Sequence, residues 1–362
     1  MTLDPAMTGD RTDPHAQART ARQQPFLLHS MSVFHEMFKI LFTYKKIESV
    51  LEVGVESGQV SSIYTQLGAS KVYCIDPYPT TELRETLAKN PKLELVERPS
   101  PQVLAELAAA DLYVLDGDHN YAVLHGELTY LLKHAPDAVI ALHDVLWPWS
   151  RRDLYYEPTL LAGDAKHEVS FEAGPTIWHD ELTPAGFVGH GSYSVAVEAG
   201  GERNGVLTAI EDAIAEADDD WLFVIVPAVF GMGVMVRKDA PFAKKMLDAL
   251  KPYTSSKLLA MMENNRIAMY TRVLQLQYEA VAAAENHDRF AEEIAHQRVE
   301  IERLHGDLAR QSHELQVLRE QNAQLQRQLR DPDLAAEPNI GTVLHQLSRV
   351  AGKQIRKARN GS

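Results

Sequence analysis

Cysteine is almost absent from this sequence, since Cys74 is the single one among 362 residues. One thiol cannot form an internal disulfide, so a disulfide-stabilised fold is excluded and nothing indicates an oxidising compartment. Cys74 lies in the apolar run KVYCID, which predicts a buried structural thiol. A nucleophilic role would need a partner base, and the sequence shows none for it.

Long apolar runs and an apolar signal segment are also missing. No run approaches the ~20 residues that a membrane-spanning helix needs. Residues 1–25 are rich in Thr, Asp, Gln and Pro, lack the apolar core of a signal peptide, and are expected to be disordered. We therefore expect a cytoplasmic protein, and the pattern leaves peripheral binding to the inner membrane open.

Basic charge is the third deficit, because 36 Lys and Arg residues stand against 50 Asp and Glu residues, for a formal net charge of −14. Nucleic acid binding requires a basic surface, so we expect no nucleic acid partner. The hydrophobic fraction of 45%, by contrast, is enough for a sizeable core. A length of 362 residues predicts two to three structural units.

Five short β-rich runs alternate with helix-like segments from residue 48 onward. The runs are ESVLEV, KVYCID, LELVE, ADLYVLD and AVIALHD. This alternation predicts βαβ units and a parallel sheet. Apolar spacing over 26–44 predicts a helix that covers the sheet, and residues 221–238 predict two closing strands. The expected fold is α/β, a doubly wound Rossmann-like domain over residues 26–255, with an irregular insertion at 146–204.

A heptad repeat follows this domain within residues 256–331. The outward positions of the repeat are nearly all Glu, Arg, Gln and His. The inner a series is Ile294, Ile301, Leu308, Leu315, Asn322 and Leu329, and the d series is Phe290, Gln297, Leu304, Gln311, Leu318 and Leu325. This pattern predicts a long α-helical coiled coil, and Ile at a, Leu at d and one Asn at a favour a parallel homodimer. A long helix packed on its own domain is the alternative.

The last predicted element is a basic amphipathic helix over residues 338–362. Residues 340–362 carry five Lys and Arg residues and no acid, and their apolar residues fall on one helical face. Such a helix suits an anionic membrane surface or an acidic partner protein. A solvated, frayed tail is the alternative.

A glycine turn after the first predicted strand is the clearest functional motif. In VLEVGVESG an acid, Glu52, precedes a turn bounded by Gly54 and Gly58. Glycine lets a backbone turn sharply and approach a ligand, and doubly wound sheets bind ligands at this edge. A dinucleotide site would show Gly-x-Gly-x-x-Gly, and this turn lacks it. The turn resembles motif I of class I methyltransferases, which implies that it holds the amino acid end of S-adenosylmethionine.

Further cofactor contacts are expected at the ends of the following strands. Asp76 closes the second strand, where an acid can accept hydrogen bonds from ribose hydroxyls. Ser100 follows the third strand, and the resemblance implies that this position lies beside the adenine. Asp116, at the end of the fourth strand, is expected to reach the cofactor as well.

Two polar motifs, LDGDHNY and LHDV, stand at the ends of the fourth and fifth strands. Adjacent strands in a sheet lie about 5 Å apart, so the side chains of these motifs should gather where a methyl group is transferred. The residues expected in this cluster are Asp116, Asp118, His119, His143 and Asp144.

Together, these motifs resemble a bacterial methyltransferase family that includes macrolide-sugar O-methyltransferases and cephalosporin-hydroxylase-like proteins. The resemblance covers residues 48–145 well and 205–237 loosely. The resemblance does not extend over residues 146–204, which are expected to form a substrate lid. The lid contains His179, Asp180 and Glu181, which could belong to the lid surface or to a second metal site, and to which we assign no role.

In that family, carboxylates at these two strand ends bind a divalent cation, usually Mg²⁺, which implies Asp116 and Asp144 as ligands. Such a cation suits carboxylate oxygens and, bound to vicinal hydroxyls, would lower the pKa of the attacking oxygen. His143 departs from the acid common in metal-binding relatives, and imidazole prefers softer metals. His119 is the expected general base, with His143 second. A structural, hydrogen-bonded role is the alternative for each histidine.

The expected activity is S-adenosylmethionine-dependent O-methylation of a sugar hydroxyl, in the biosynthesis of a bacterial polysaccharide or glycan. The coiled coil and the basic tail motivate this pathway, because their layout resembles O-antigen chain-terminating methyltransferases. Methylation of a small natural product, such as a macrolide or aminosugar, is one alternative. A non-catalytic scaffold whose coiled coil recruits a glycosyltransferase is the other.

Overall fold

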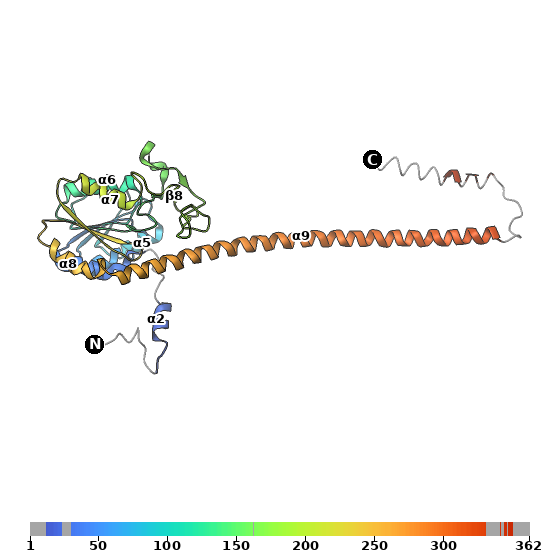
Figure 1. The fold of residues 1–362 in the computed structure, drawn as a ribbon, viewed down its shortest axis with the longest axis horizontal. Coiled ribbons are helices and arrows are strands. Elements are labelled where there is room, and N and C mark those ends of the chain that lie inside the picture. Colours follow the sequence, from blue (N-terminus) through green and yellow to red (C-terminus); the bar gives the residue numbers. More distant parts are fainter. Residues whose placement is uncertain are drawn as a thin grey trace. The chain divides into compact units, whose positions relative to one another are not determined.

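The computed structural model describes residues 12–23, 30–161, 163–330, 341, 344–345 and 347–349. The chain forms two compact units, residues 1–280 and residues 281–362 (Figure 1). The first unit contains the α/β domain and the beginning of a long helix, and the second contains the remainder of that helix.

A seven-stranded sheet forms the centre of the first unit, in the order β3-β2-β1-β4-β5-β10-β9. Its strands are β1 (Ser49–Val53), β2 (Lys71–Ile75), β3 (Leu93–Val96), β4 (Leu112–Leu115), β5 (Val139–Leu142), β9 (Trp221–Val226) and β10 (Met232–Arg237). Strands β1 to β5 are parallel, whereas β10 is antiparallel to β5 and β9. The predicted doubly wound, Rossmann-like fold is confirmed. The strand order reverses between β1 and β4, where such sheets bind ligands.

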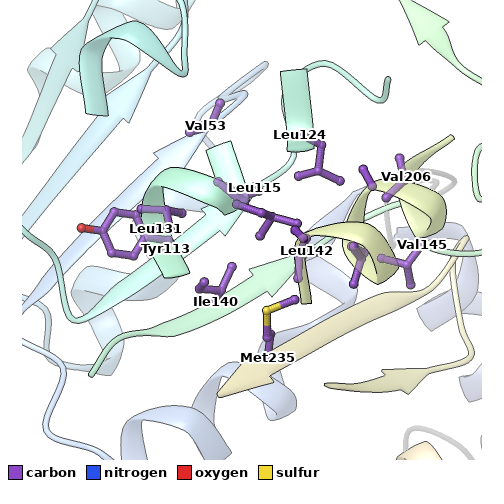
Figure 2. Close-up of a cluster of buried hydrophobic side chains, with 14 of the residues drawn as sticks. Val53, Tyr113, Leu115, Leu124, Leu131, Ile140, Leu142, Val145, Val206 and Met235 are labelled. Carbon is purple, nitrogen blue, oxygen red and sulfur yellow. The ribbon is translucent and has the colours of Figure 1, made fainter. Parts of the chain in front are cut away.

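Successive strand residues alternate between two buried clusters, one on each face of the sheet. On one face, Leu115, Leu142 and Met235 meet side chains of α6 and α7, including Leu124 and Val206 (Figure 2). The other cluster includes residues of η1, α3, α4, α5 and α8. These helices are η1 (Met31–Phe34), α3 (His35–Tyr44), α4 (Ser61–Leu67), α5 (Thr81–Ala88), α6 (Tyr121–His134), α7 (Val206–Glu216) and α8 (Ala243–Thr254). Because helices cover both faces of the sheet, a ligand could reach it only at the ends of the strands.

The insertion at 146–204 contains a small antiparallel sheet in the order β6-β8-β7. Its strands are β6 (Leu154–Tyr155), β7 (Val169–Ser170) and β8 (Ser194–Ala196), and two short 3₁₀ helices are η3 (Pro158–Leu160) and η4 (Gly163–Ala165). The buried carboxylate of Asp153 accepts hydrogen bonds from the backbone of Tyr121 at 2.8 Å and of Gly205 at 2.6 Å. It therefore ties the insertion to the beginnings of both α6 and α7.

Helix α9 (Lys257–Arg330) runs without interruption for 74 residues. Ile267 and Thr271 are buried, so the helix packs on the α/β domain near its start. The apolar a and d residues from Phe290 to Leu329 are instead 47–86% exposed. The predicted long helix is present, and pairing of its apolar seam with a second chain stays a prediction.

Both chain ends were expected to contain distinctive segments. Residues 12–23, within the stretch expected to be disordered, include helix α2 (Ala16–Gln23). The basic helix predicted over 338–362 lies largely outside the described residues. Within the described part of the chain, no helix is both long and apolar enough to cross a bilayer.

Candidate functional site

The glycine turn after β1 lies directly against the end of β4. Gly54 has a φ of +83°, and a Cβ atom on it would come within 2.0 Å of the Asp116 carbonyl oxygen. Its amide donates to the Ile75 carbonyl at 3.0 Å, which ties the turn to β2 as well. A Cβ on Gly117 would likewise lie 2.8 Å from the Val53 side chain. Gly54 and Gly117 therefore allow the ends of β1, β2 and β4 to pack closely together.

Glu52 points into the protein behind this turn. Its carboxyl is buried and accepts hydrogen bonds from the hydroxyls of Ser61 and Tyr64 on α4. The pKa of Glu52 is raised to about 8, because burial and the nearby Asp116 outweigh the lowering effect of the hydrogen bonds from Ser61 and Tyr64. Glu52 therefore braces the turn against α4, and its predicted contact with the cofactor stays a prediction.

The other expected cofactor residues lie at the ends of their strands. Asp76 follows β2, and its Oδ1 accepts the Tyr78 amide at 3.0 Å. Ser100 precedes the short helix η2 (Gln102–Ala105), and its hydroxyl is buried beside the carboxyl of Glu127 on α6. Burial raises the pKa of Glu127 to about 8. Asp76 and Ser100 thus follow β2 and β3, and their contact with a cofactor stays a prediction.

Four of the five predicted cluster residues meet at the ends of β4 and β5. His143 Nδ1 lies 2.9 Å from Asp116 Oδ1 and 3.5 Å from Asp144 Oδ1. His119 Nε2 lies 3.4 Å from Asp144 Oδ2 and 3.9 Å from Asp116 Oδ1. Both histidines and Asp144 are buried. Two carboxylates and two imidazoles therefore form one cluster at the edge of the sheet.

Asp118, the fifth predicted residue, turns toward the insertion. Its Oδ1 accepts the backbone amide of Tyr156 at 3.1 Å, and the carbonyl of His119 accepts the amide of Leu154 at 3.1 Å. Burial raises the pKa of Asp118, although the Tyr156 amide opposes this shift. Asp118 therefore holds the insertion against the cluster.

Both ring nitrogens of His143 are engaged by acceptors. Nδ1 faces Asp116, and Nε2 lies 2.9 Å from the backbone carbonyl oxygen of Val229. A carbonyl oxygen can only accept, so Nε2 carries a proton. Burial lowers the pKa of His143, but the carboxylates of Asp116 and Asp144 outweigh it and raise the value to about 9. At neutral pH, His143 is therefore an imidazolium that donates from both nitrogens.

This arrangement does not fit the expected Mg²⁺ site. His143 Nδ1 lies 2.9 Å from Asp116 Oδ1 and 3.5 Å from Asp144 Oδ1, the two carboxylates expected to bind the cation. An imidazolium has no lone pair for a metal and repels a cation. In the described ranges, no group of three or more His, Cys, Asp or Glu side chains is arranged to hold a metal ion. The structure therefore does not support a metal ion at Asp116 and Asp144.

Aromatic side chains of the insertion border the cluster. The ring of Tyr156 lies 6.2 Å from that of His119 and 6.4 Å from that of Tyr193. Burial of the Tyr156 hydroxyl, together with the carboxylates of Asp116 and Asp144, raises its pKa strongly. The ring of Tyr156 is nevertheless half exposed, so its outer face is open to an acceptor molecule.

His179, Asp180 and Glu181 do not join this cluster. All three are exposed, and His179 Nδ1 lies 3.6 Å from Glu181 Oε2. Sequence reasoning missed Val229, whose backbone carbonyl contacts His143, and Glu263, whose side chain binds the backbone amide of Val229. Neither residue belongs to a sequence motif.

The comparisons with known proteins concern the same part of the chain. Residues 51–145, which run from β1 to the end of the LHDV motif, match a family described as "Methyltransferase domain". No curated protein matches the chain. These residues hold the glycine turn and the whole histidine–carboxylate cluster.

Solved methyltransferase structures are similar to the chain at low identity. They include the S-adenosylhomocysteine-bound methyltransferase PaMTH1 from Podospora anserina, with 15% identity, 61% of this chain and 86% of that chain covered, and a TM-score of 0.37. The O-methyltransferase TomG from Streptomyces achromogenes has 14% identity, 65% and 91% coverage, and a TM-score of 0.35. The 1,6-didemethyltoxoflavin-N1-methyltransferase from Burkholderia thailandensis has 13% identity, 65% and 90% coverage, and a TM-score of 0.33.

Proposed function

We propose that this chain is an S-adenosylmethionine-dependent O-methyltransferase that acts on a sugar hydroxyl. One observation carries the proposal. Within the segment that matches methyltransferase domains, the Gly54 turn packs on the Asp116 backbone, next to the cluster of His119, His143 and Asp144. A place for the methyl donor and a place for proton transfer are therefore adjacent.

The residues that would hold the cofactor line the carboxyl edge of three strands. The Gly54 turn would hold its amino acid end, Asp76 would accept hydrogen bonds from the ribose, and Ser100 would lie beside the base. S-adenosylmethionine, when bound, supplies an electrophilic methyl group on a sulfonium. A Cβ on Gly54 or Gly117 would clash with the Asp116 backbone or the Val53 side chain, so both glycines let the turn pack closely on the end of β4. A glycine turn of this kind lets a ligand approach the backbone closely, which supports the proposed place for the cofactor.

His119 is the proposed general base. Its Nε2 lies 3.4 Å from Asp144 Oδ2 and 3.9 Å from Asp116 Oδ1, so two carboxylates would stabilise an imidazolium formed during the reaction. His143 is unsuited to the role, because both of its nitrogens already donate. It instead neutralises one carboxylate charge and fixes the orientation of Asp116. Removal of bulk water by burial strengthens each of these interactions.

The half-exposed ring of Tyr156 supports a cyclic acceptor. The centre of this ring lies 6.2 Å from that of His119, the proposed base. Tyr193 contacts the same ring and extends the aromatic wall. The apolar C–H face of a sugar ring can pack on such rings while its hydroxyls face the carboxylates. The insertion would then act as a lid over the acceptor.

We further propose that the apolar seam of α9 forms a parallel dimer of the enzyme. The uncovered a and d residues of the seam would be buried in a two-stranded coiled coil, with Asn322 setting the register. Such a stalk favours an assembly-linked enzyme over a free tailoring enzyme, and the basic tail would contact a membrane surface or a glycosyltransferase. Glycan biosynthesis is therefore the pathway that we favour.

The direct test measures transfer of a labelled methyl group to a panel of nucleotide sugars and oligosaccharides. His119→Gln should lower the rate by about a hundredfold or more, as loss of a general base does. His179→Gln is the matched control, because His179 is an exposed histidine of the same domain. Equal rates for the wild type and His119→Gln would contradict the assignment. Methylation of small aglycones alone would favour the tailoring alternative.

A further inference from the structure

The loop between β9 and β10 has an unusual backbone. Three consecutive residues have positive φ values, at 44° for Val229, 61° for Phe230 and 90° for Gly231. The last is a glycine, for which this conformation is common. A β-branched residue rarely adopts it, because its side chain crowds the backbone. The conformation at Val229 and Phe230 must therefore be imposed by contacts with the rest of the fold.

The side chain of Glu263, on the second turn of α9, supplies that contact. Its Oε2 accepts the Val229 amide at 2.9 Å, and its Oε1 accepts the Phe230 amide at 2.8 Å. The carboxylate therefore holds two successive amides that face the same way. Only an ionised carboxylate offers two acceptor oxygens and no donor, so it suits this pair of amides.

Glu263 is itself held as a charged group. Arg266 donates to both of its oxygens, at 2.8 Å and 2.7 Å. Burial raises the pKa of Glu263, but Arg266 and the two loop amides outweigh burial and lower it overall. The Arg266 guanidinium also lies 4.3 Å from the centre of the Phe230 ring. Each carboxylate oxygen thus accepts one amide and one guanidinium donor, which fixes the side chain in place.

The opposite side of the loop reaches the proposed active site. The Val229 carbonyl accepts from His143 Nε2 at 2.9 Å. The Phe230 carbonyl accepts from the Leu146 amide at 2.8 Å, just after the LHDV motif. A peptide unit that turned over at Val229 would remove the carbonyl from His143. The orientation of one backbone segment therefore decides whether the imidazole keeps its second partner.

We infer that Glu263 is a positioning residue, which sets the β9–β10 loop so that the Val229 carbonyl holds His143 against Asp116. The first turns of α9 are then part of the site's support, and not only the base of a stalk. All of these contacts lie within the first unit. The positioning is a property of the fold, and only its effect on turnover rests on the proposed function.

The test compares Glu263→Gln with Thr271→Val in the full-length chain. Thr271 lies on the same buried side of α9, and its hydroxyl bonds within the helix, to the Ile267 carbonyl. The control therefore alters helix packing without touching the loop. In the wild type, the amides of Val229 and Phe230 should exchange slowly with solvent deuterium. Glu263→Gln should speed their exchange by about tenfold or more, and Thr271→Val should not.

A second readout follows His143 itself by nitrogen-detected NMR. The wild type should show a hydrogen-bonded proton on Nε2, and Glu263→Gln should lose this signal or broaden it. The turnover number should fall while the affinity for S-adenosylmethionine changes little. Unprotected Val229 and Phe230 amides in the wild type would overturn the inference, even if the variant failed to fold. Absence of methyl transfer would leave both of these readouts valid and would count against the proposed function alone.

Discussion

Gly54→Ala is the substitution for which the structure predicts the largest local effect. A non-glycine residue at a φ of +83° costs about 1–2 kcal/mol. The added Cβ would also lie 2.0 Å from the Asp116 carbonyl oxygen and 2.7 Å from the Gly117 Cα. These are backbone atoms, so no side chain can rotate away, and overpacking adds about 1–3 kcal/mol. The expected total is about 2–5 kcal/mol, a large part of the stability of a typical domain.

Gly68→Ala separates the two contributions. Gly68 has a φ of +121°, but a Cβ on it would meet nothing within 4 Å. This control therefore carries backbone strain without a clash. All four tryptophans lie between residues 147 and 221, so denaturant unfolding followed by tryptophan fluorescence reports on the α/β domain. Gly54→Ala should be about 1–3 kcal/mol less stable than Gly68→Ala.

The same pair of variants tests the link between the turn and the site. Gly54→Ala must displace the Asp116 backbone, so its affinity for S-adenosylmethionine should fall by about tenfold or more. Gly68→Ala should bind as the wild type does, because Gly68 caps the far end of α4. Equal stability of the two variants, together with equal cofactor affinity, would refute the proposed contact between the glycine turn and β4.

Three further predictions concern the interior, the cluster and the helix. Folding raises the pKa of Glu52 from 4.5 to about 8. Between these pH values the folded chain keeps a proton that the unfolded chain releases, so the free energy of unfolding should fall as the pH rises from about 4.5 to 8. Glu52→Gln should flatten this fall, with its gain in unfolding free energy over the wild type growing from pH 5 to pH 8. Asp144→Ala should lower methyl transfer by about a hundredfold or more while cofactor affinity, measured by calorimetry, stays within about twofold. Leu308→Glu puts a charge at the centre of the seam, so sedimentation should show a dimeric wild type and a monomeric variant; a monomeric wild type would remove the dimer.

The elements of the α/β domain were predictable because each carries a local signal. Apolar runs of four or five residues mark β1 to β5, and Gly54 marks a turn that no other residue could make. The clustering of Asp116, His119, His143 and Asp144 followed from adjacent strand ends, without knowledge of side-chain contacts. Local patterns of this kind depend on the period of the secondary structure, which a single sequence displays.

The rest of the site depends on contacts that leave no periodic trace. The metal site expected at Asp116 and Asp144 is not supported, because Nε2 of His143 finds its partner in a backbone carbonyl 86 residues further along the chain. The support of that loop comes from Glu263, a further 34 residues away. A backbone acceptor has no residue identity, so the sequence could not reveal that His143 would be protonated on both nitrogens. The contacts of His143 with Asp116 and Val229 appear only in the folded structure.

The central claim is that the Gly54 turn and its neighbours bind S-adenosylmethionine. Calorimetric titration of the cofactor into the full-length protein tests it most directly, with Mg²⁺ and with a chelator. The account predicts saturable binding at one site per chain with the same affinity in both conditions, and strongly weakened binding by Gly54→Ala. No detectable binding to the folded wild type in either condition would contradict the account.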